Sequence, residues 1–565
     1  MYRQEIDPLG HLPFSALLAA LPLLVLLILL GAVRMKSHWA GLTGLAVALV
    51  LAVSVYGMPL RQAADGALEG AAFGLLPIVW IILNAVWINK LQRASGHFDI
   101  IGRAFSSLST DFRVQAIVVA FCFGAMIESL SGFGTPIAVT ALILMTIGLT
   151  PLKAAAVATF ANTAPAAFGS VGNPIEALAK ATSLPADELG AMVGRQSAVI
   201  AFLVPFALLL ILDGRRGLRQ VWPAALVAGL GFGAGQFVCS NFFVEQLTDL
   251  VAATTATGAV VLLLRFWSPA PAEPTRPAPP PPTGPPAPPG TPRAAPATTT
   301  LAAPAATTLR TEDPGTRHRR EVLKAFSPYA LLTVLFALTS VEGPVERFVH
   351  DQGVTFRWPG LNVLSPQGTP VTAATFDLNW LGTSGTMLLL TGLLTALVLR
   401  VPPRAALRCY GQAFRQIRWA VLTISCVLAL SYVMNLSGMA VSLGTWLAGL
   451  GSVFALLSGF LGWFGVALTG SDTSSNALFG GMQIAAAHRI GISPLLMAAT
   501  NSTGGVQGKA AAMQNLAIAA GAVGLPGKEG DILRKVIGWS LALLAVFCVL
   551  AFLQSTVLTW TIPGG

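Results

Sequence analysis

Long apolar runs alternate with short polar loops along most of this chain. A helix that crosses a bilayer needs about 20 predominantly apolar residues. Many of the runs approach or exceed that length, and few of them contain a charge. The pattern predicts an all-α polytopic membrane protein with about 12–14 transmembrane segments. The uninterrupted runs cover residues 14–33, 39–57, 71–89, 198–212, 221–239, 250–266, 326–340, 381–399, 419–436 and 535–557.

Two further apolar blocks, residues 114–170 and 453–520, are interrupted by Gly, Pro, Ser, Thr and Asn. Such interruptions predict broken or re-entrant helices. Backbone groups freed by a break cannot face hydrocarbon, so they must line a cavity or a ligand. Tight helix packing on small residues is the alternative explanation for one such block. Two blocks of similar composition favour a site.

The two blocks repeat one pattern. Ser131 and Pro151 have the same separation as Ser474 and Pro494, and an Asn-hydroxyl pair follows each, at Asn162-Thr163 and Asn501-Ser502. The first block begins just after a basic loop. The segment 439–451 is too short and too rich in Gly for a crossing, so the second block is expected to begin on the other side. Inverted repeats with discontinuous helices are typical of secondary transporters.

Composition supports a membrane protein and excludes other classes. Only 10% of the 565 residues are charged, against roughly 25% in soluble domains. The net charge of +10 lies in short loops, which indicates topology rather than nucleic-acid binding. The five cysteines show no spacing typical of disulfides or zinc, and we expect no cofactor and no metal. No catalytic motif is present, so we do not expect an enzyme.

The basic loops predict the orientation. The loops that contain Lys and Arg can all be cytoplasmic if both termini lie outside. The acidic loops 241–249 and 342–377 then also lie outside. Residues 12–33 are too long for a signal-peptide core and lack a basic flank, so they predict the first transmembrane helix.

A proline-rich tract divides the chain. Sixteen of the 38 prolines lie between Pro269 and Pro314. We predict a cytoplasmic linker at 268–320 that joins an N-terminal transmembrane half, 1–267, to a C-terminal half, 321–565.

Three charges within the broken blocks are the main candidates for function. Glu128 and Asp472 sit at membrane depth, where an unpaired ionised carboxylate costs several kcal/mol. A carboxylate that takes up a proton is what a proton-coupled carrier needs. A static salt bridge is the alternative, and Lys509 could pair with Asp472 or attract an anion. The helix N-termini of such breaks suit a carboxylate substrate.

These motifs resemble the L-lactate permease family of proton-coupled lactate and glycolate carriers. The resemblance covers nearly the whole chain apart from the proline-rich tract and the loop around 343–378. It rests on Glu128-x-x-x-Gly-Phe-Gly-Thr-Pro, Asn162-Thr-Ala-Pro-Ala-Ala-Phe-Gly, Ser471-Asp-Thr-Ser-Ser-Asn-Ala-Leu-Phe-Gly and Gly504-Gly-Val-x-Gly-Lys. The chain departs from the family at Ser131 and at Ala512-Met-Gln-Asn515, both beside the predicted site. An elevator mechanism follows only from wider analogy between folds.

We interpret the chain as a proton-coupled symporter of L-lactate and related short 2-hydroxymonocarboxylates such as glycolate, in a bacterial inner membrane. The expected partners are a small carboxylate anion, protons and the lipid bilayer; a homodimer stays open. Glu128 and Asp472 are the predicted proton-coupling residues. The alternatives are a sodium-coupled carrier of di- or monocarboxylates, and a channel or sensor. The predicted substrate-binding residues are Ser131, Gly132, Asn162, Thr163, Ser471, Asn501, Ser502, Thr503 and Lys509.

Overall fold

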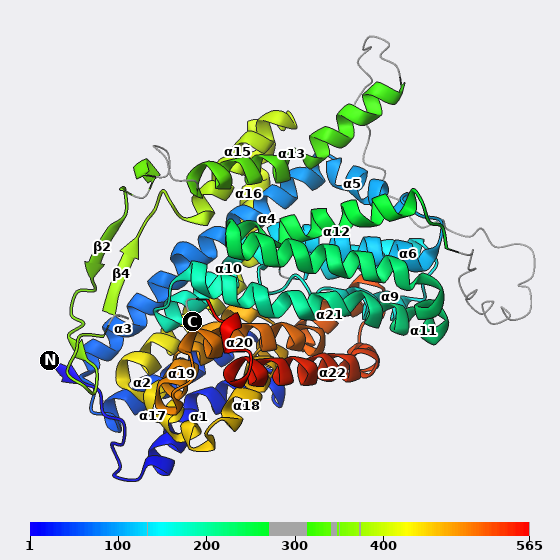
Figure 1. Cartoon of the computed structure of the whole chain (residues 1–565). Helices are drawn as coiled ribbons and strands as arrows, with labels where there is room; N and C mark the ends of the chain where they lie inside the picture. The colour runs from blue at the N-terminus through cyan, green and yellow to red at the C-terminus, as the bar shows by residue number, and fades with distance from the viewer. Residues whose placement is uncertain (133, 270–313, 341–346, 350, 372–373, 564–565) are drawn as a thin grey trace, which may run out of the picture.

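The computed structural model describes residues 1–132, 134–269, 314–340, 347–349, 351–371 and 374–563. Helices make up nearly all of it and run side by side along the length of the molecule (Figure 1). Most of the predicted linker, 270–313, lies outside the described residues, as does Phe133 in the first broken block.

The N-terminal half contains a strand and a long series of helices. The elements are β1 (Tyr2–Arg3), α1 (Leu12–Gly31), α2 (Ser37–Ser54), α3 (Leu60–Phe73), η1 (Gly74–Val79), α4 (Trp80–Ala94), α5 (His97–Ser106), α6 (Phe112–Ala116), η2 (Ile117–Phe123), α7 (Gly124–Leu130), α8 (Thr135–Thr146), α9 (Pro151–Ala161), α10 (Gly169–Thr182), α11 (Ala186–Phe242), η3 (Glu245–Leu247) and α12 (Thr248–Leu264).

The C-terminal half adds three short strands and more helices. The elements are α13 (Pro314–Ser340), β2 (Val354–Arg357), β3 (Val363–Leu364), β4 (Thr375–Leu378), α15 (Ser384–Val398), α16 (Pro403–Ser437), α17 (Met439–Leu447), η5 (Ala448–Leu450), α18 (Val453–Thr469), α19 (Asp472–Ile490), α20 (Pro494–Gly508), η6 (Lys509–Ala511), α21 (Met513–Ala522), α22 (Glu529–Thr556) and η7 (Thr559–Thr561).

The predicted all-α membrane fold is confirmed. In the described parts of the chain, nine helices are long and apolar enough to cross a membrane, and five shorter apolar helices accompany them. The predicted runs 198–212 and 221–239 are two helical segments of α11, which folds back on itself at Gly214, where φ is +60° and the backbone is not helical. Gly229 on the second segment lies against the backbone of Phe202 on the first. The strands form two small sheets: β1 pairs with β3 in parallel, and β2 pairs with β4 antiparallel, Val354 opposite Leu378.

Both broken blocks form the expected interrupted helices. The first breaks after Leu130 and again between Ala161 and Gly169; the second breaks at 470–471 and at 509–512. Pro151 and Pro494 each occupy the first turn of a helix, where a missing N–H costs nothing. The matched prolines of the repeat therefore start equivalent helices, α9 and α20.

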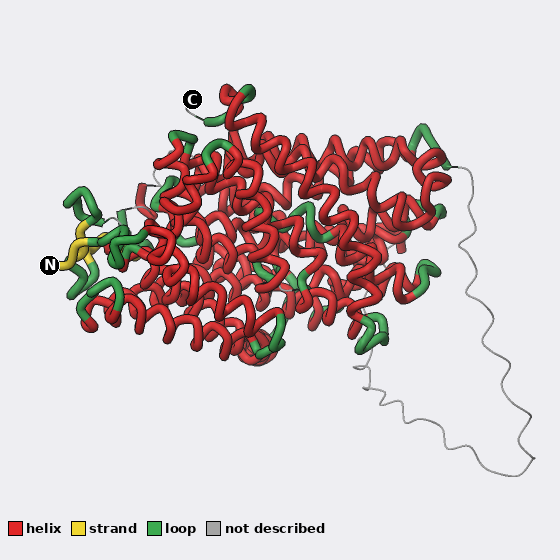
Figure 2. Tube along the Cα trace, turned by 90° about the horizontal axis from the view of Figure 1, so that it is seen from below, coloured by secondary structure: helices red, strands yellow, loops and turns green. Residues whose placement is uncertain are grey.

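Helices from the two sequence halves are interleaved in space. Helix α16 packs against α2 and α3, while α20 packs against α11, and α19 against α10. The red tubes of Figure 2 show one continuous stack of helices rather than two separate bodies. This interleaving brings the broken blocks of the two halves together at the centre.

The two ends of the stack differ in chemistry. At one end, Tyr2 Oη donates hydrogen bonds to the backbone oxygens of Tyr56 and Ser437, and the N-terminus lies there (Figure 1). The opposite end, here called the basic end, contains the Arg113 region, where Lys153 Nζ donates to the oxygen of Leu212.

Arg113, just before the first broken block, is fully buried. Its guanidinium lies 2.8 Å from Asp111 Oδ2 and 3.1 Å from Asp213 Oδ2. These two carboxylates compensate the charge, so Arg113 fastens the start of α6 to the bend in α11.

Candidate functional site

All four helix breaks line a single cavity of about 600 Å³. Gly132 and Gly134 come from the first break, Ala166 from the second, Ser471 from the third and Lys509 from the fourth. The sequence indicated that freed backbone groups must line a cavity. The structure shows that they share one.

Helices begin at the cavity after each of these breaks. Ser471 Oγ caps α19 by accepting a hydrogen bond from the backbone N–H of Ser474 at 3.3 Å. The wall also contains the N-cap of α8, Gly134, and the first-turn residues Gln514 and Asn515 of α21. Helix N-termini carry partial positive charge and free N–H donors, so this wall favours an anion.

An ion pair joins the two halves at the cavity wall. Lys509 Nζ lies 2.5 Å from Glu128 Oε1, and Asn162 Nδ2 donates to Glu128 Oε2 at 3.1 Å. The side chains of Lys509 and Glu128 are only 9% and 3% exposed. The sequence left Asp472 open as the partner of Lys509. The structure instead pairs Lys509, the first residue of η6, with Glu128 near the end of α7.

Two glycines make room for the Glu128 carboxylate. A Cβ at Gly169 would lie 2.9 Å from Glu128 Oε1, and a Cβ at Gly132 would lie 3.2 Å from the same oxygen. The Gly132 N–H donates to Ser170 Oγ at 3.0 Å. The glycines of the two motifs are therefore required where two breaks close around one carboxylate.

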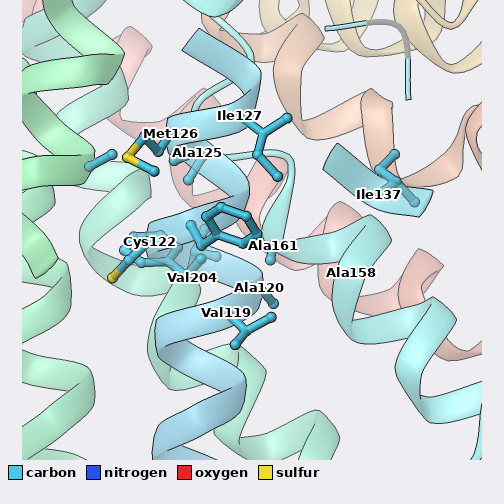
Figure 3. Packing of buried hydrophobic residues seen from close by; sticks show 14 of the residues in the cluster. Val119, Ala120, Cys122, Ala125, Met126, Ile127, Ile137, Ala158, Ala161 and Val204 are labelled. Atoms are coloured by element: carbon cyan, nitrogen blue, oxygen red, sulfur yellow. The ribbon is translucent and has the colours of Figure 1, made fainter. Parts of the chain in front are cut away.

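The helix that carries Glu128 is enclosed by protein. Figure 3 shows Val119, Cys122 and Met126 along η2 and α7, with Ala158 of α9 and Val204 of α11 nearby. These residues are nearly or fully buried. This packing fixes the position of α7, and therefore the place at which Glu128 meets the cavity.

Asp472 belongs to a second hydrogen-bond network, in which its partners are uncharged side chains. Its Oδ2 accepts hydrogen bonds from Ser502 Oγ at 2.7 Å and from Asn476 Nδ2 at 3.2 Å. Asn476 also donates to the backbone oxygen of Pro174 and accepts from Asn501 Nδ2 at 2.9 Å. The other carboxylate oxygen, Oδ1, has no hydrogen-bond partner among the described residues.

The predicted site residues divide into two groups. Gly132, Ser471, Lys509, Glu128 and Asp472 line the cavity. The others are buried and do not line it. Asn162 instead supports Glu128, and Ser502 supports Asp472 directly. The residues of this second group are Ser131, Asn162, Thr163, Asn501, Ser502 and Thr503.

Several wall residues were not predicted. Ser170 and Asn173 line the cavity from α10, and Gln514 and Asn515 line it from α21. Ser170 has φ of +50°, a left-handed conformation that directs the chain back toward Glu128. The departure of the sequence from its relatives at residues 512–515 was the signal that could have identified the α21 pair.

A further correction concerns Asp249, which the sequence analysis assigned to the acidic loop 241–249 on the outside. It is fully buried in the first turn of α12. Burial follows because α12 begins at Thr248 and packs this turn against α7 and α11.

The cavity opens beside α2 and α16. Lys36, Gln416 and Trp419 are exposed and line its outer part. The ring of Trp419 stacks on His38 with centroids 4.6 Å apart. No group of His, Cys, Asp or Glu suited to a metal ion occurs in the described part of the chain.

Membrane-length helices, helix breaks and a polar cavity between them are typical of a membrane transporter. The model of the L-lactate permease family matches residues 15–558. The chain belongs to this family and is a multi-pass membrane transporter.

Individual relatives cover the full length. The chain is 37% identical to the L-lactate permease of Bacillus subtilis (strain 168) over 100% of both chains. It is 35% identical to a glycolate permease of Escherichia coli (strain K12) over 99% of each. Among solved structures, the YdaH transporter of Alcanivorax borkumensis covers 86% of each chain at 16% identity, with a TM-score of 0.42.

Proposed function

We propose that this chain is a proton-coupled symporter of L-lactate and related short 2-hydroxymonocarboxylates such as glycolate. The observation that carries the proposal is the Glu128–Lys509 pair at the wall of a cavity where helix N-termini begin. L-lactate and glycolate are the substrates named for the full-length relatives.

Charge balance explains why a proton would accompany the substrate. In the empty site, ionised Glu128 neutralises Lys509 at 2.5 Å. A substrate carboxylate that approaches Lys509 adds a second negative charge in a poorly hydrated place, which is costly. Protonation of Glu128 removes that charge and frees Lys509 to bind the anion. Both the empty and the loaded site are then neutral.

The polar wall offers partners for the rest of a 2-hydroxy acid. Ser170, Asn173 and Gln514 carry uncharged donors and acceptors on the same cavity as Lys509. A hydroxyl placed against such groups forms hydrogen bonds that a plain fatty acid cannot form, and buried polar groups left without a partner cost binding energy. Asp472 is the second candidate proton carrier, with one oxygen unpaired among the described residues.

The transport cycle and its setting complete the proposal. We place the chain in a bacterial inner membrane, with the basic end cytoplasmic and both termini outside, by the positive-inside rule. The two broken blocks act as inverted repeats, and one bundle moves against the other in an elevator-like step. The cavity mouth at Lys36 then faces the cytoplasm. A homodimer is compatible with this arrangement.

The test is uptake of labelled L-lactate by purified protein in liposomes. With choline as the only external cation, an acidic outside should drive accumulation that collapses when a protonophore is added. Unlabelled glycolate should compete, and acetate, which lacks the hydroxyl, should compete poorly. Uptake that needs sodium and ignores the pH gradient would overturn proton coupling in favour of the sodium-coupled alternative.

A further inference from the structure

A third buried carboxylate lies behind the ion pair, outside the cavity wall. Asp249 is 0% exposed. Its Oδ1 accepts a hydrogen bond from Gln236 Nε2 at 3.3 Å, and its Oδ2 has no partner within the described chain. A buried carboxylate with only one oxygen hydrogen-bonded is costly in a membrane protein, so its presence calls for an explanation.

The same glutamine connects Asp249 to the site. Gln236 Nε2 also donates to the backbone oxygen of Ala164 at 3.3 Å. Ala164 belongs to the break that carries Asn162, the hydrogen-bond donor to Glu128. Helix α12 packs directly on α7, and the Asp249 carboxylate is close enough to Glu128 and Lys509 to interact with both charges.

On its other side, Asp249 is connected to the surface by further acids. Glu245 lies one helical turn earlier in the chain, and both carboxylates are within electrostatic reach of the Cys239 thiol. Glu245 in turn interacts with Glu176 and with the exposed Asp187. The acids become steadily more buried from Asp187 through Glu245 to Asp249.

This acidic row leads away from the cavity mouth. The mouth is at Lys36. Glu245 lies in η3, which follows the last residue of α11. Asp213, which pairs with Arg113, lies at the opposite end of that segment of α11. The row therefore reaches the end of the molecule opposite the basic end.

We propose that Asp249 is a proton-relay residue that carries protons between the acidic surface at Glu245 and the carboxylate of Glu128. This rests on the proposed proton symport and specifies its proton path. In each step an Asp249 carboxylic acid gives its proton to ionised Glu128, which becomes the acid. Asp249, left as carboxylate, regains a proton from the Glu245 side. Bonds and charge balance, because one O–H bond breaks as one forms.

The surroundings of Asp249 fit a relay better than a structural role. The charges that act on Asp249 are those of Glu128 on α7 and Lys509 on η6, while Glu245 on η3 and Cys239 on α11 lie nearby in the chain. Lys509 already has Glu128 at 2.5 Å, and no side-chain cation is in salt-bridge contact with Asp249 in the described residues. A purely structural acid would be expected to have both oxygens bonded.

Replacing Asp249 by Asn separates proton movement from substrate movement. In liposomes, Asp249→Asn should lose at least tenfold in lactate uptake driven by a pH gradient. It should keep lactate counterflow, the exchange of labelled for unlabelled substrate at equal pH, which needs no net proton transfer. Glu188→Gln, an exposed acid in the first turn of α11, serves as the matched control and should retain both activities.

The outcomes are distinct. The relay is overturned if Asp249→Asn takes up lactate under a pH gradient at the wild-type rate. It is also overturned if the folded variant loses counterflow as well as uptake. Failure of the wild-type protein to respond to a pH gradient overturns the proposed symport instead. If Asp249→Asn does not fold, Glu245→Gln and Asp249→Glu decide the matter. Glu245→Gln should slow pH-driven uptake and leave counterflow unchanged. Asp249→Glu, which keeps a carboxylate, should retain pH-driven uptake. The opposite results contradict the relay.

Discussion

Lys509 and Glu128 are 381 residues apart in the chain, yet Lys509 Nζ lies 2.5 Å from Glu128 Oε1 at the wall of the central cavity. One charge comes from each half. The ion pair therefore makes the site depend on the packing of both halves at once, and the following predictions begin from it.

Removing one charge of this pair should harm the fold more than removing both. Lys509→Gln leaves Glu128 ionised and buried, and breaking a buried pair in this way costs about 3–5 kcal/mol. The double variant Glu128→Gln, Lys509→Gln replaces the pair by two amides and should recover most of that loss. Thermal unfolding of the purified variants in detergent checks this. Equal stability of the single and double variants would contradict a close electrostatic pair.

Transport should respond differently from stability. Glu128→Gln keeps the shape of the side chain and can still bond Asn162, but it cannot release a proton. We expect it to abolish lactate uptake driven by a pH gradient while the protein still folds. Undiminished pH-driven uptake in liposomes would remove Glu128 from the mechanism, and the same measurement on Asp472→Asn would then test the second carboxylate.

The sequence was sufficient to predict where helices break and which charges lie at those breaks. Gly, Pro and hydroxyl residues within apolar runs indicate helix breaks, whose unpaired backbone groups cannot face lipid. The matched Pro151 and Pro494 each begin a helix, α9 and α20. Glu128, Asp472 and Lys509 stood out because the blocks contain so few other charges. All three line the cavity.

Long-range pairing could not be predicted in the same way. Nothing in one sequence distinguishes Asp472 from Glu128 as the partner of Lys509, since the choice depends on where the break at η6 lies relative to the end of α7. Asp249 was misassigned because a single acid next to an apolar run reads as a loop residue. Its burial depends on α11, the preceding helix, and on α7, which is remote in sequence.

The packing of Gly505 should control the position of Asp472. A Cβ at Gly505 would lie 2.5 Å from Asp472 Oδ1 and 2.9 Å from Val466 Cγ2. Gly505→Ala must therefore displace the carboxylate from its bond to Ser502. Loss of a hydrogen bond to a charged group is worth about 1.5–3 kcal/mol, so lactate uptake should fall by roughly tenfold to a hundredfold.

Gly521→Ala is the matched control for this substitution. No atom lies within 4 Å of a Cβ at Gly521, which is also helical. Alanine there should preserve uptake and raise stability by about 0.5–1 kcal/mol. If Gly505→Ala transports as well as Gly521→Ala, the exact placement of Asp472 does not matter for transport.

The charge at the cavity mouth should set how readily the anion reaches the site. Lys36 is exposed at the mouth, beside the stacked His38 and Trp419. Lys36→Glu reverses one unit of charge near the surface, which is worth about 1 kcal/mol or more, so the KM for lactate efflux should rise by roughly fivefold with little change in the maximal rate. Added salt should shrink the difference by screening.

Lys535→Glu makes the same change at an exposed position off the cavity wall and should leave KM unaltered. An equal rise in both variants would mean that overall charge, rather than the mouth, governs access.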